Sequence, residues 1–199
     1  MLDHGGVGVT KHWNRIVRWL AEHAPATGSV LRSRPDRVGL RELTEQTGLD
    51  LPADLREWWN LCDGTDRLAF AEILPPFYTP YGPAAALRSW QVKRRMWAET
   101  WIESDAGPSA GSPAYGFHPA WLPIAFDGCG DALVVDLRPG PAHGCVLEWD
   151  RMLCKVLTFE WPSVPAMLDD VATALETHSR VRHCDPTITI EGRLDWRCG

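Results

Sequence analysis

The sequence has no long apolar segment, and this absence argues against a helix that crosses a membrane. No apolar run approaches the roughly 20 residues that such a helix needs. Residues 1–15 also lack the basic start and apolar middle of a secretory signal peptide. We therefore expect a cytoplasmic protein that makes no contact with a membrane.

Positive charge is scarce as well. The chain has 20 Lys and Arg residues against 26 Asp and Glu residues, which gives a formal net charge of −6. Proteins that bind nucleic acid depend on Lys and Arg to neutralise phosphates. We therefore expect no direct binding to nucleic acid.

Cysteine is present, but not in the spacings that indicate a disulfide framework or a zinc site. None of the six cysteines forms a CxxC pair. The chain of 199 residues, 45% of them hydrophobic, is long enough for one sizeable core without covalent support. We expect one domain over residues 1–199 and six reduced thiols, because a reducing compartment does not maintain disulfides.

The motifs of common enzymes are absent too. There is no glycine-rich phosphate loop, no GxSxG and no HExxH. The DGCGD segment lacks the oxygen spacing of a calcium loop, and His143 and Cys145 have no second pair at zinc-ligand spacing. Cys62 lies on the apolar stripe of a predicted helix, which favours an inert thiol over a nucleophile. We expect no enzyme activity, no metal and no cofactor.

The clearest structure that the sequence does predict is an antiparallel meander over residues 121–150. Three strands are expected at Trp121–Phe126, Ala132–Leu137 and Cys145–Asp150, separated by turns rich in glycine and proline. Alternation along the strands predicts one face against a core and one face largely in water. Five carboxylates and one arginine give this stretch a net charge of −4.

Helical periodicity surrounds the meander. Trp13, Ile16 and Leu20 share one helix face after Thr10, a candidate N-cap. Buried positions are expected on the apolar faces throughout, with Trp58, Trp121, Leu133, Val135 and Trp149 the clearest cases. Further helices are expected near residues 40–48, 52–63, 82–101 and 163–175, strands near 67–79 (broken at Pro75-Pro76), 153–159 and 187–190, and a mobile loop at 104–118.

Four segments occur in a characteristic order, namely LPADLREWWNLCDG, ILPPFYTP, WLPIAFDGCGDALVVDL and GCVLEWD. Together they resemble the SUKH superfamily, the SMI/KNR cell-wall-assembly-regulator-like domains, and the resemblance covers roughly residues 40–178. Asp63-Gly64 stands where the family usually has Asn-Gly. The resemblance implies an α+β fold in which helices pack on a curved antiparallel sheet, and no catalytic residues carry over.

The resemblance also implies a protein-binding function. Bacterial members are commonly immunity proteins that neutralise toxins, many of them nucleases or deaminases, and fungal members are cell-wall signalling scaffolds. We therefore expect a protein partner, with a toxin domain as the leading hypothesis and a cell-wall regulator as the alternative.

Charge suggests where such a partner would bind. An acidic edge of Asp127, Asp131, Glu148 and Asp150 would attract the basic surface of a toxin that acts on nucleic acid. The alternative is that Asp127 and Asp131 only stabilise their turn. An apolar anchor beside the edge is expected from Trp121 or from the Pro75–Tyr78 segment, which includes Phe77 and Tyr78.

Overall fold

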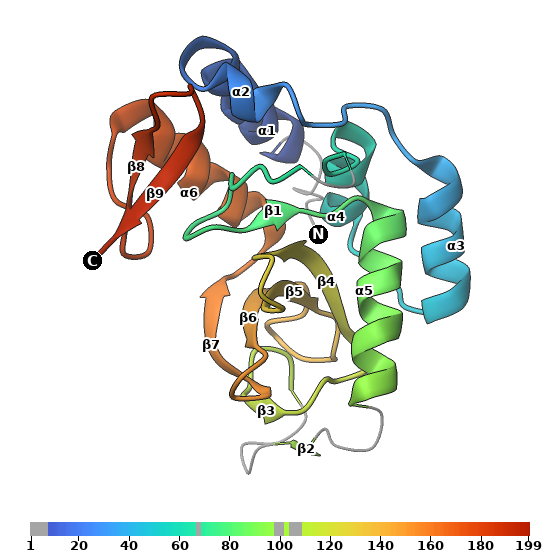
Figure 1. Cartoon of the computed structure of the whole chain (residues 1–199). Coiled ribbons are helices and arrows are strands. Elements are labelled where there is room, and N and C mark those ends of the chain that lie inside the picture. The colour runs from blue at the N-terminus through green and yellow to red at the C-terminus, as the bar shows by residue number, and fades with distance from the viewer. Residues whose placement is uncertain (1–7, 67–68, 98–101, 104–108) are drawn as a thin grey trace.

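The fold is α+β and is built around one antiparallel sheet (Figure 1). The computed structural model describes residues 8–66, 69–97, 102–103 and 109–199. The helices are α1 (Gly8–His23), α2 (Pro25–Gly28), α3 (Arg37–Thr47), α4 (Ala53–Leu61), α5 (Pro83–Met96) and α6 (Val164–Thr177). The strands are β1 (Thr79–Pro80), β2 (Ile102–Glu103), β3 (Ala114–Tyr115), β4 (Trp121–Phe126), β5 (Ala132–Asp136), β6 (Val146–Asp150), β7 (Lys155–Trp161), β8 (Cys184–Ile188) and β9 (Leu194–Cys198).

The predicted meander forms the centre of the sheet. Strands β4, β5, β6 and β7 are consecutive neighbours in the order β1-β4-β5-β6-β7-β3-β2, and each neighbouring pair is antiparallel. Gly128 and Gly130 take positive φ in the turn between β4 and β5, as the glycine-rich sequence predicts. The strand predicted near residues 153–159 is β7.

The helix predictions are confirmed apart from their ends. Gly48 closes α3 in the left-handed conformation, and the Ser163 side chain caps α6 by accepting from the Ala166 N–H. The prediction that Thr10 caps the first helix is wrong, because α1 already includes Gly8; the Thr10 hydroxyl donates to Glu57 instead. Trp101 lies outside the described residues.

The prediction that one face of the meander meets water is wrong, because both faces are buried. Alternate residues of β5 point to opposite sides of the sheet. Leu133 and Val135 belong to the larger core with the helices, whereas Val134 packs in a second core on the opposite face. The second core contains Ala114, Phe117, Trp121, Ala132, Val134, Cys145, Leu147, Trp149 and Val156.

The segment that covers the second face was predicted as a mobile loop. Residues 104–108 of that loop lie outside the described residues, but residues 109–118 include β3 and pack closely. Asp136 and Arg138 form a fully buried ion pair at 2.8 Å, and they bond to this segment through the Gly111 N–H and the Ser112 carbonyl. The loop prediction therefore fails because these bonds hold a glycine-rich segment against the sheet.

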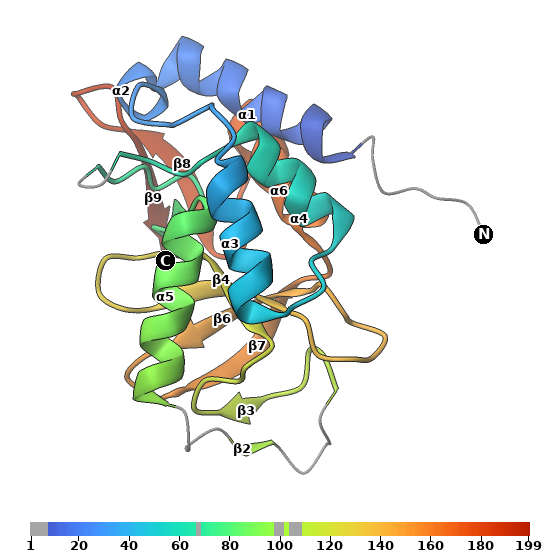
Figure 2. The ribbon, with the colours of Figure 1, turned by 90° about the vertical axis from the view of Figure 1, so that its right-hand side faces the viewer.

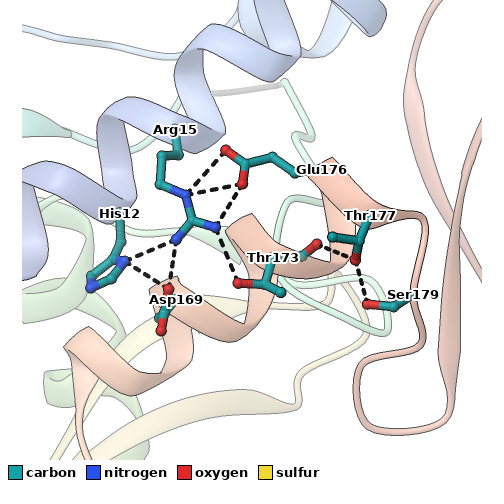
Figure 3. A network of polar contacts seen from close by, with 7 residues as sticks. All are labelled: His12, Arg15, Asp169, Thr173, Glu176, Thr177 and Ser179. Atoms are coloured by element: carbon teal, nitrogen blue, oxygen red, sulfur yellow. Dashed lines mark hydrogen bonds and ion pairs between the residues drawn. The ribbon is translucent and has the colours of Figure 1, made fainter.

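Helices cover the other face and one end of the sheet. Figures 1 and 2 show α3 and α5 side by side, with α1 at the end of the molecule that also carries α2 and the β8–β9 strands. Arg15 joins α1 to α6 through Asp169 at 2.6 Å and Glu176 at 2.7 Å, as Figure 3 shows. None of the described helices is long and apolar enough to span a membrane.

The chain ends in a hairpin of β8 and β9 that packs on the larger core. Cys184 and Cys198 face each other across this hairpin and form a disulfide. The prediction of six free thiols is therefore wrong. Cys62, Cys129, Cys145 and Cys154 are free thiols.

Candidate docking groove along helix α5

Three of the predicted acidic residues do gather at one end of the sheet. The turns after β4 and after β6 lie at the same end because their strands run in the same direction. Burial raises the pKa of Asp131, and the nearby charges of Asp127, Asp150 and Glu148 raise it further, whereas a hydrogen bond from the Arg151 N–H lowers it. Asp127, Asp150 and Glu148 therefore all lie close enough to Asp131 to act on its charge.

Each of these turn carboxylates also accepts local hydrogen bonds. Asp127 accepts from the N–H groups of Cys129 and Gly130, both at 2.8 Å. Asp131 accepts from the Arg151 N–H at 2.7 Å, and Asp150 from the Leu153 N–H at 2.8 Å. The structural role that we kept as the alternative for Asp127 and Asp131 is thus real, and it leaves their negative charge in place.

Glu148 differs from the other three, because the C-terminal addition covers it. It accepts from the Tyr78 hydroxyl at 2.5 Å and from Arg182 at 2.8 Å. Arg182 also pairs with Glu160 at 2.7 Å and lies over the Trp161 ring. Glu148 therefore attaches the C-terminal segment to the sheet, and its carboxylate is already paired, unlike the other three.

The predicted apolar anchors are mostly inaccessible. Trp121 and Tyr78 expose no surface, so their assignment to a contact surface is wrong for the folded chain. Phe77 is 45% exposed and is the one of the three that a partner would reach. Burial and the neighbouring Glu148 raise the pKa of Tyr78, so its hydroxyl stays protonated and donates.

A groove of about 610 Å³ runs along α5. Residues from the α2–α3 link, the segment after α4, β1, α5 and the end of β4 line it. The lining is Arg32, Asp36, Asp63, Thr65, Asp66, Pro80, Tyr81, Gly82, Ala84, Ala85, Arg88, Ser89, Val92, Lys93 and Phe126.

An ion pair forms the inner end of this groove. Asp63 is 5% exposed and pairs with Arg32 at 2.5 Å. Burial raises the pKa of Asp63, which Arg32 opposes. The carboxylate lies against Gly82, where any side chain would collide with it, and a side chain on Gly64 would come within 2.6 Å of the Gly82 nitrogen. Two glycines thus bring this carboxylate next to the start of α5.

Lys93 forms the other end. Its Nζ donates to the Gly130 carbonyl at 2.7 Å and lies 3.9 Å from the centre of the Trp149 ring. Burial lowers the pKa of Lys93 to about 8, although Asp131 and Asp127 act in the opposite direction. The Gly128–Gly130 turn is therefore held beside α5, as Figure 2 shows for the segment after β4. The acidic turn and the groove form one surface.

Groups that would suit catalysis are buried or dispersed. Burial raises the pKa values of the Cys62 and Cys145 thiols to about 12, so neither is a nucleophile near neutral pH. Burial lowers the pKa of His118 to about 4, and its Nδ1 accepts from the Ala120 N–H. Within the described residues, no group of three or more His, Cys, Asp or Glu side chains is arranged to hold a metal ion.

Sequence reasoning missed most of the groove. Lys93 is half-buried and Arg94 donates to the Phe117 carbonyl, although three consecutive basic residues on a helix are usually solvated. The groove combines four stretches of the chain, 32–36, 63–66, 80–93 and residue 126, which helix and strand periodicity does not bring together. The one local signal is Gly82-Pro83, which marks the start of α5 at the groove.

The fold agrees with a comparison against known protein families. A model described as the SMI1 / KNR4 family (SUKH-1) matches residues 36–170. The match covers more than half of the chain, so the chain belongs to this family. Helices α1 and α2 and the β8–β9 hairpin lie outside the matched residues.

Curated relatives are fungal proteins named for the cell wall. The chain is 27% identical to a glucan synthesis regulatory protein of Neurospora crassa, over 67% of this chain and 32% of that protein. It is 25% identical to the cell wall biosynthesis/cell cycle regulator smi1 of Schizosaccharomyces pombe, over 73% of this chain and 31% of that protein. It is also 24% identical to a KNR4/SMI1 homolog of Yarrowia lipolytica, over 81% of this chain and 30% of that protein. The chain thus spans about a third of the length of these relatives.

Proposed function

We propose that this protein is a non-enzymatic protein-binding domain that acts as an immunity protein, neutralising a cognate toxin by occupying its surface. The observation that carries the proposal is the continuous surface formed by the α5 groove and the acidic turn. It offers aromatic, cationic and anionic contacts together. Protein interfaces combine such contacts, whereas an enzyme needs titratable groups that converge on one reacting atom.

The charge of the chain favours a basic partner. A toxin that acts on nucleic acid presents a positive surface to its substrate, and a protein of net charge −6 would associate with it faster than a neutral one. Such an inhibitor needs no chemistry of its own. It needs a rigid surface, which the sheet with two buried faces supplies.

Co-expression tests the immunity function. A toxin domain encoded next to the gene would be produced in a bacterial host with and without this chain. The expected result is growth arrest by the toxin alone and restored growth when both are present. Persistent arrest, together with no complex between the two purified proteins, would contradict the proposal.

A second candidate function is regulation of cell-wall synthesis, which the printed names of the fungal relatives favour. The test is to express the chain in a Schizosaccharomyces pombe strain that lacks smi1. Restored cell-wall integrity would support this function. If the chain does not restore cell-wall integrity but does rescue cells from a toxin, only the immunity function is supported.

A further inference from the structure

The α5 groove contains aromatic surface that no neighbouring strand or helix covers completely. The rings of Tyr81 and Phe126 stack with centres 4.7 Å apart and planes 12° apart, and both line the groove. Phe70 packs on Phe126 with centres 5.6 Å apart and is itself 42% exposed. Aromatic ring faces attract cations, and arginine in particular stacks on them.

Most of the cations in the groove already have partners. Arg32 pairs with Asp63, and Lys93 is held by the Gly130 carbonyl and the Trp149 ring. Of the groove's anions, Asp36 accepts from the Gly39 N–H as the cap of α3. Asp66 is exposed, and its carboxylate has no hydrogen bond or ion pair with any other described residue.

The balance of charge in this surface is negative. Five carboxylates line the groove or lie in the adjoining turn, against four cations, a net charge of −1. The carboxylates are Asp36, Asp63, Asp66, Asp127 and Asp131, and the cations are Arg32, Arg88, Lys93 and Arg151, whose guanidinium donates to the Cys129 carbonyl in the turn. The Asp127 charge reaches both Tyr81 and Lys93, which places it at the aromatic end of the groove.

We propose that this groove is the docking site for an arginine-bearing segment of a protein partner. The guanidinium would lie on the Tyr81–Phe126 stack, between the carboxylates of Asp66 and Asp127. This proposal rests on the proposed protein-binding function. In it, the groove is the contact surface and the partner's contacting segment is basic. A groove of about 610 Å³ holds a few side chains of such a segment rather than a whole domain.

Arg88 defines the competing possibility. It is exposed and lines the same groove, so an acidic segment would pair with it. Two of the three groove cations are already engaged, whereas Asp66 and the second oxygen of Asp127 have no hydrogen bond or ion pair with another described residue. The groove therefore favours the basic segment, and the acidic one becomes an outcome of the test.

Two short synthetic peptides serve as probes, one with two arginines spaced by glycine and one with two glutamates in their place. Each would be titrated at low salt into isotope-labelled protein while the backbone amide resonances are followed. We expect the arginine peptide to shift the amides of Tyr81, Ser89 and Phe126, and the glutamate peptide to leave them unchanged.

Charge-neutralising variants then locate the contact. In the double variant Asp66→Asn/Asp127→Asn, the amide of residue 127 keeps an oxygen for the Cys129 and Gly130 N–H groups, so the turn is retained. Its affinity for the arginine peptide should fall roughly threefold or more, since two exposed ion pairs are lost. The matched control Glu22→Gln/Glu191→Gln removes two exposed charges on α1 and the hairpin and should bind as the wild type does.

Any one of three results would overturn the inference. The glutamate peptide could shift the amide resonances of the groove residues, or both double variants could lose the same affinity for the arginine peptide. The arginine peptide could also shift only resonances from another surface. Failure of the inference is distinguishable from failure of the proposed function. If Asp66→Asn/Asp127→Asn binds the purified toxin as tightly as the wild type does and still rescues cells, the function stands and the groove is not the docking site. If the peptide results hold but no toxin is neutralised, the groove stands and the immunity function fails.

Discussion

Trp149 shows how much a single residue of the second core contributes. Its ring is edge-on to Phe117 with centres 5.5 Å apart, its Nε1 donates to the Gly116 carbonyl, and Lys93 lies over its face. The side chain therefore joins β6, the segment before β4 and α5. The burial predicted from the sequence for Trp58, Trp121, Leu133, Val135 and Trp149 is confirmed.

Replacing Trp149 by alanine should lower the free energy of unfolding by about 3 to 5 kcal/mol, because the cavity lies in a closed core. Urea unfolding measures this. Met152→Ala is the matched control, because Met152 is 84% exposed in the turn between β6 and β7. Its free energy of unfolding should stay within about 0.5 kcal/mol of the wild-type value. Equal midpoints for Trp149→Ala and the wild type would contradict the burial described above.

Lys93 predicts a dependence of stability on pH. Its pKa is lowered from the usual 10.5 to about 8 in the folded chain, chiefly by burial. Between these two values the unfolded chain holds a proton that the folded chain has released, so this residue's contribution to stability rises with pH across the window. Below about 8 both states are protonated, and the destabilising effect is complete.

The variant Lys93→Met removes this titration. The difference in unfolding free energy between wild type and variant should therefore shift in favour of the wild type as pH increases through the window. Urea unfolding of both proteins below and above the window tests it, and the comparison cancels the other titrating groups. A difference that does not vary with pH would show that Lys93 is not buried as described.

At the scale of elements, the C-terminal hairpin was the least predictable part of the chain. The sequence predicts one short strand near residues 187–190, and the structure contains two, with Cys184 opposite Cys198. Cysteine spacing says little about such a pair, because only the register of the second strand places the two residues opposite each other. The hairpin also lies outside the residues that match the family.

Thiol titration of the denatured protein tests the hairpin disulfide. Without reductant we expect four titratable thiols, those of Cys62, Cys129, Cys145 and Cys154, and with reductant six. The double variant Cys184→Ser/Cys198→Ser should give four in both conditions. Reduction should destabilise the fold by up to about 3 kcal/mol, the value expected for a loop of about 15 residues. Six thiols in the oxidised wild type would exclude the disulfide.

The elements that sequence reasoning predicts well are those whose signal is local. The glycine turn and the alternation of β5 lie within a few residues, and Gly48 and Ser163 mark helix ends directly. The second core was not predictable in this way, because it depends on bonds from residues 109–118 to the distant Asp136–Arg138 pair. The docking groove was missed for the same reason.

In the whole molecule, the N-terminal and C-terminal additions support each other. The Leu194 N–H donates to the Thr27 hydroxyl and the Ala26 N–H donates to the Gly192 carbonyl, so the hairpin is bonded to α2. The hairpin also holds the segment before β1, where Trp196 donates to the Glu72 carbonyl. Figure 1 shows the two additions at the same end of the molecule.

Deletion of residues 181–199 should therefore loosen regions far from the C-terminus in sequence. Amide hydrogen exchange should accelerate by at least about tenfold in residues 24–28 and 71–74, corresponding to about 1.4 kcal/mol of lost protection. The exposed pair Arg180 and Asp185 offers a control, since Asp185→Asn breaks it without removing the hairpin and should leave both regions protected. Unchanged exchange after the deletion would show that the additions are independent.

The close contact between Gly64 and Gly82 in the groove affects how sequence variation in this protein should be interpreted. Gly64 has a φ of 72° and faces the Gly82 nitrogen, and Gly82 faces the Asp63 carboxylate. In a library of random variants selected only for folding, both positions should return glycine almost without exception, whatever the partner. Invariance at residues 64 and 82 would therefore record the geometry of the backbone and carry no information about recognition. If the groove is the docking site that we propose, drift at Asp66 and Asp127 between relatives would instead follow a change of partner.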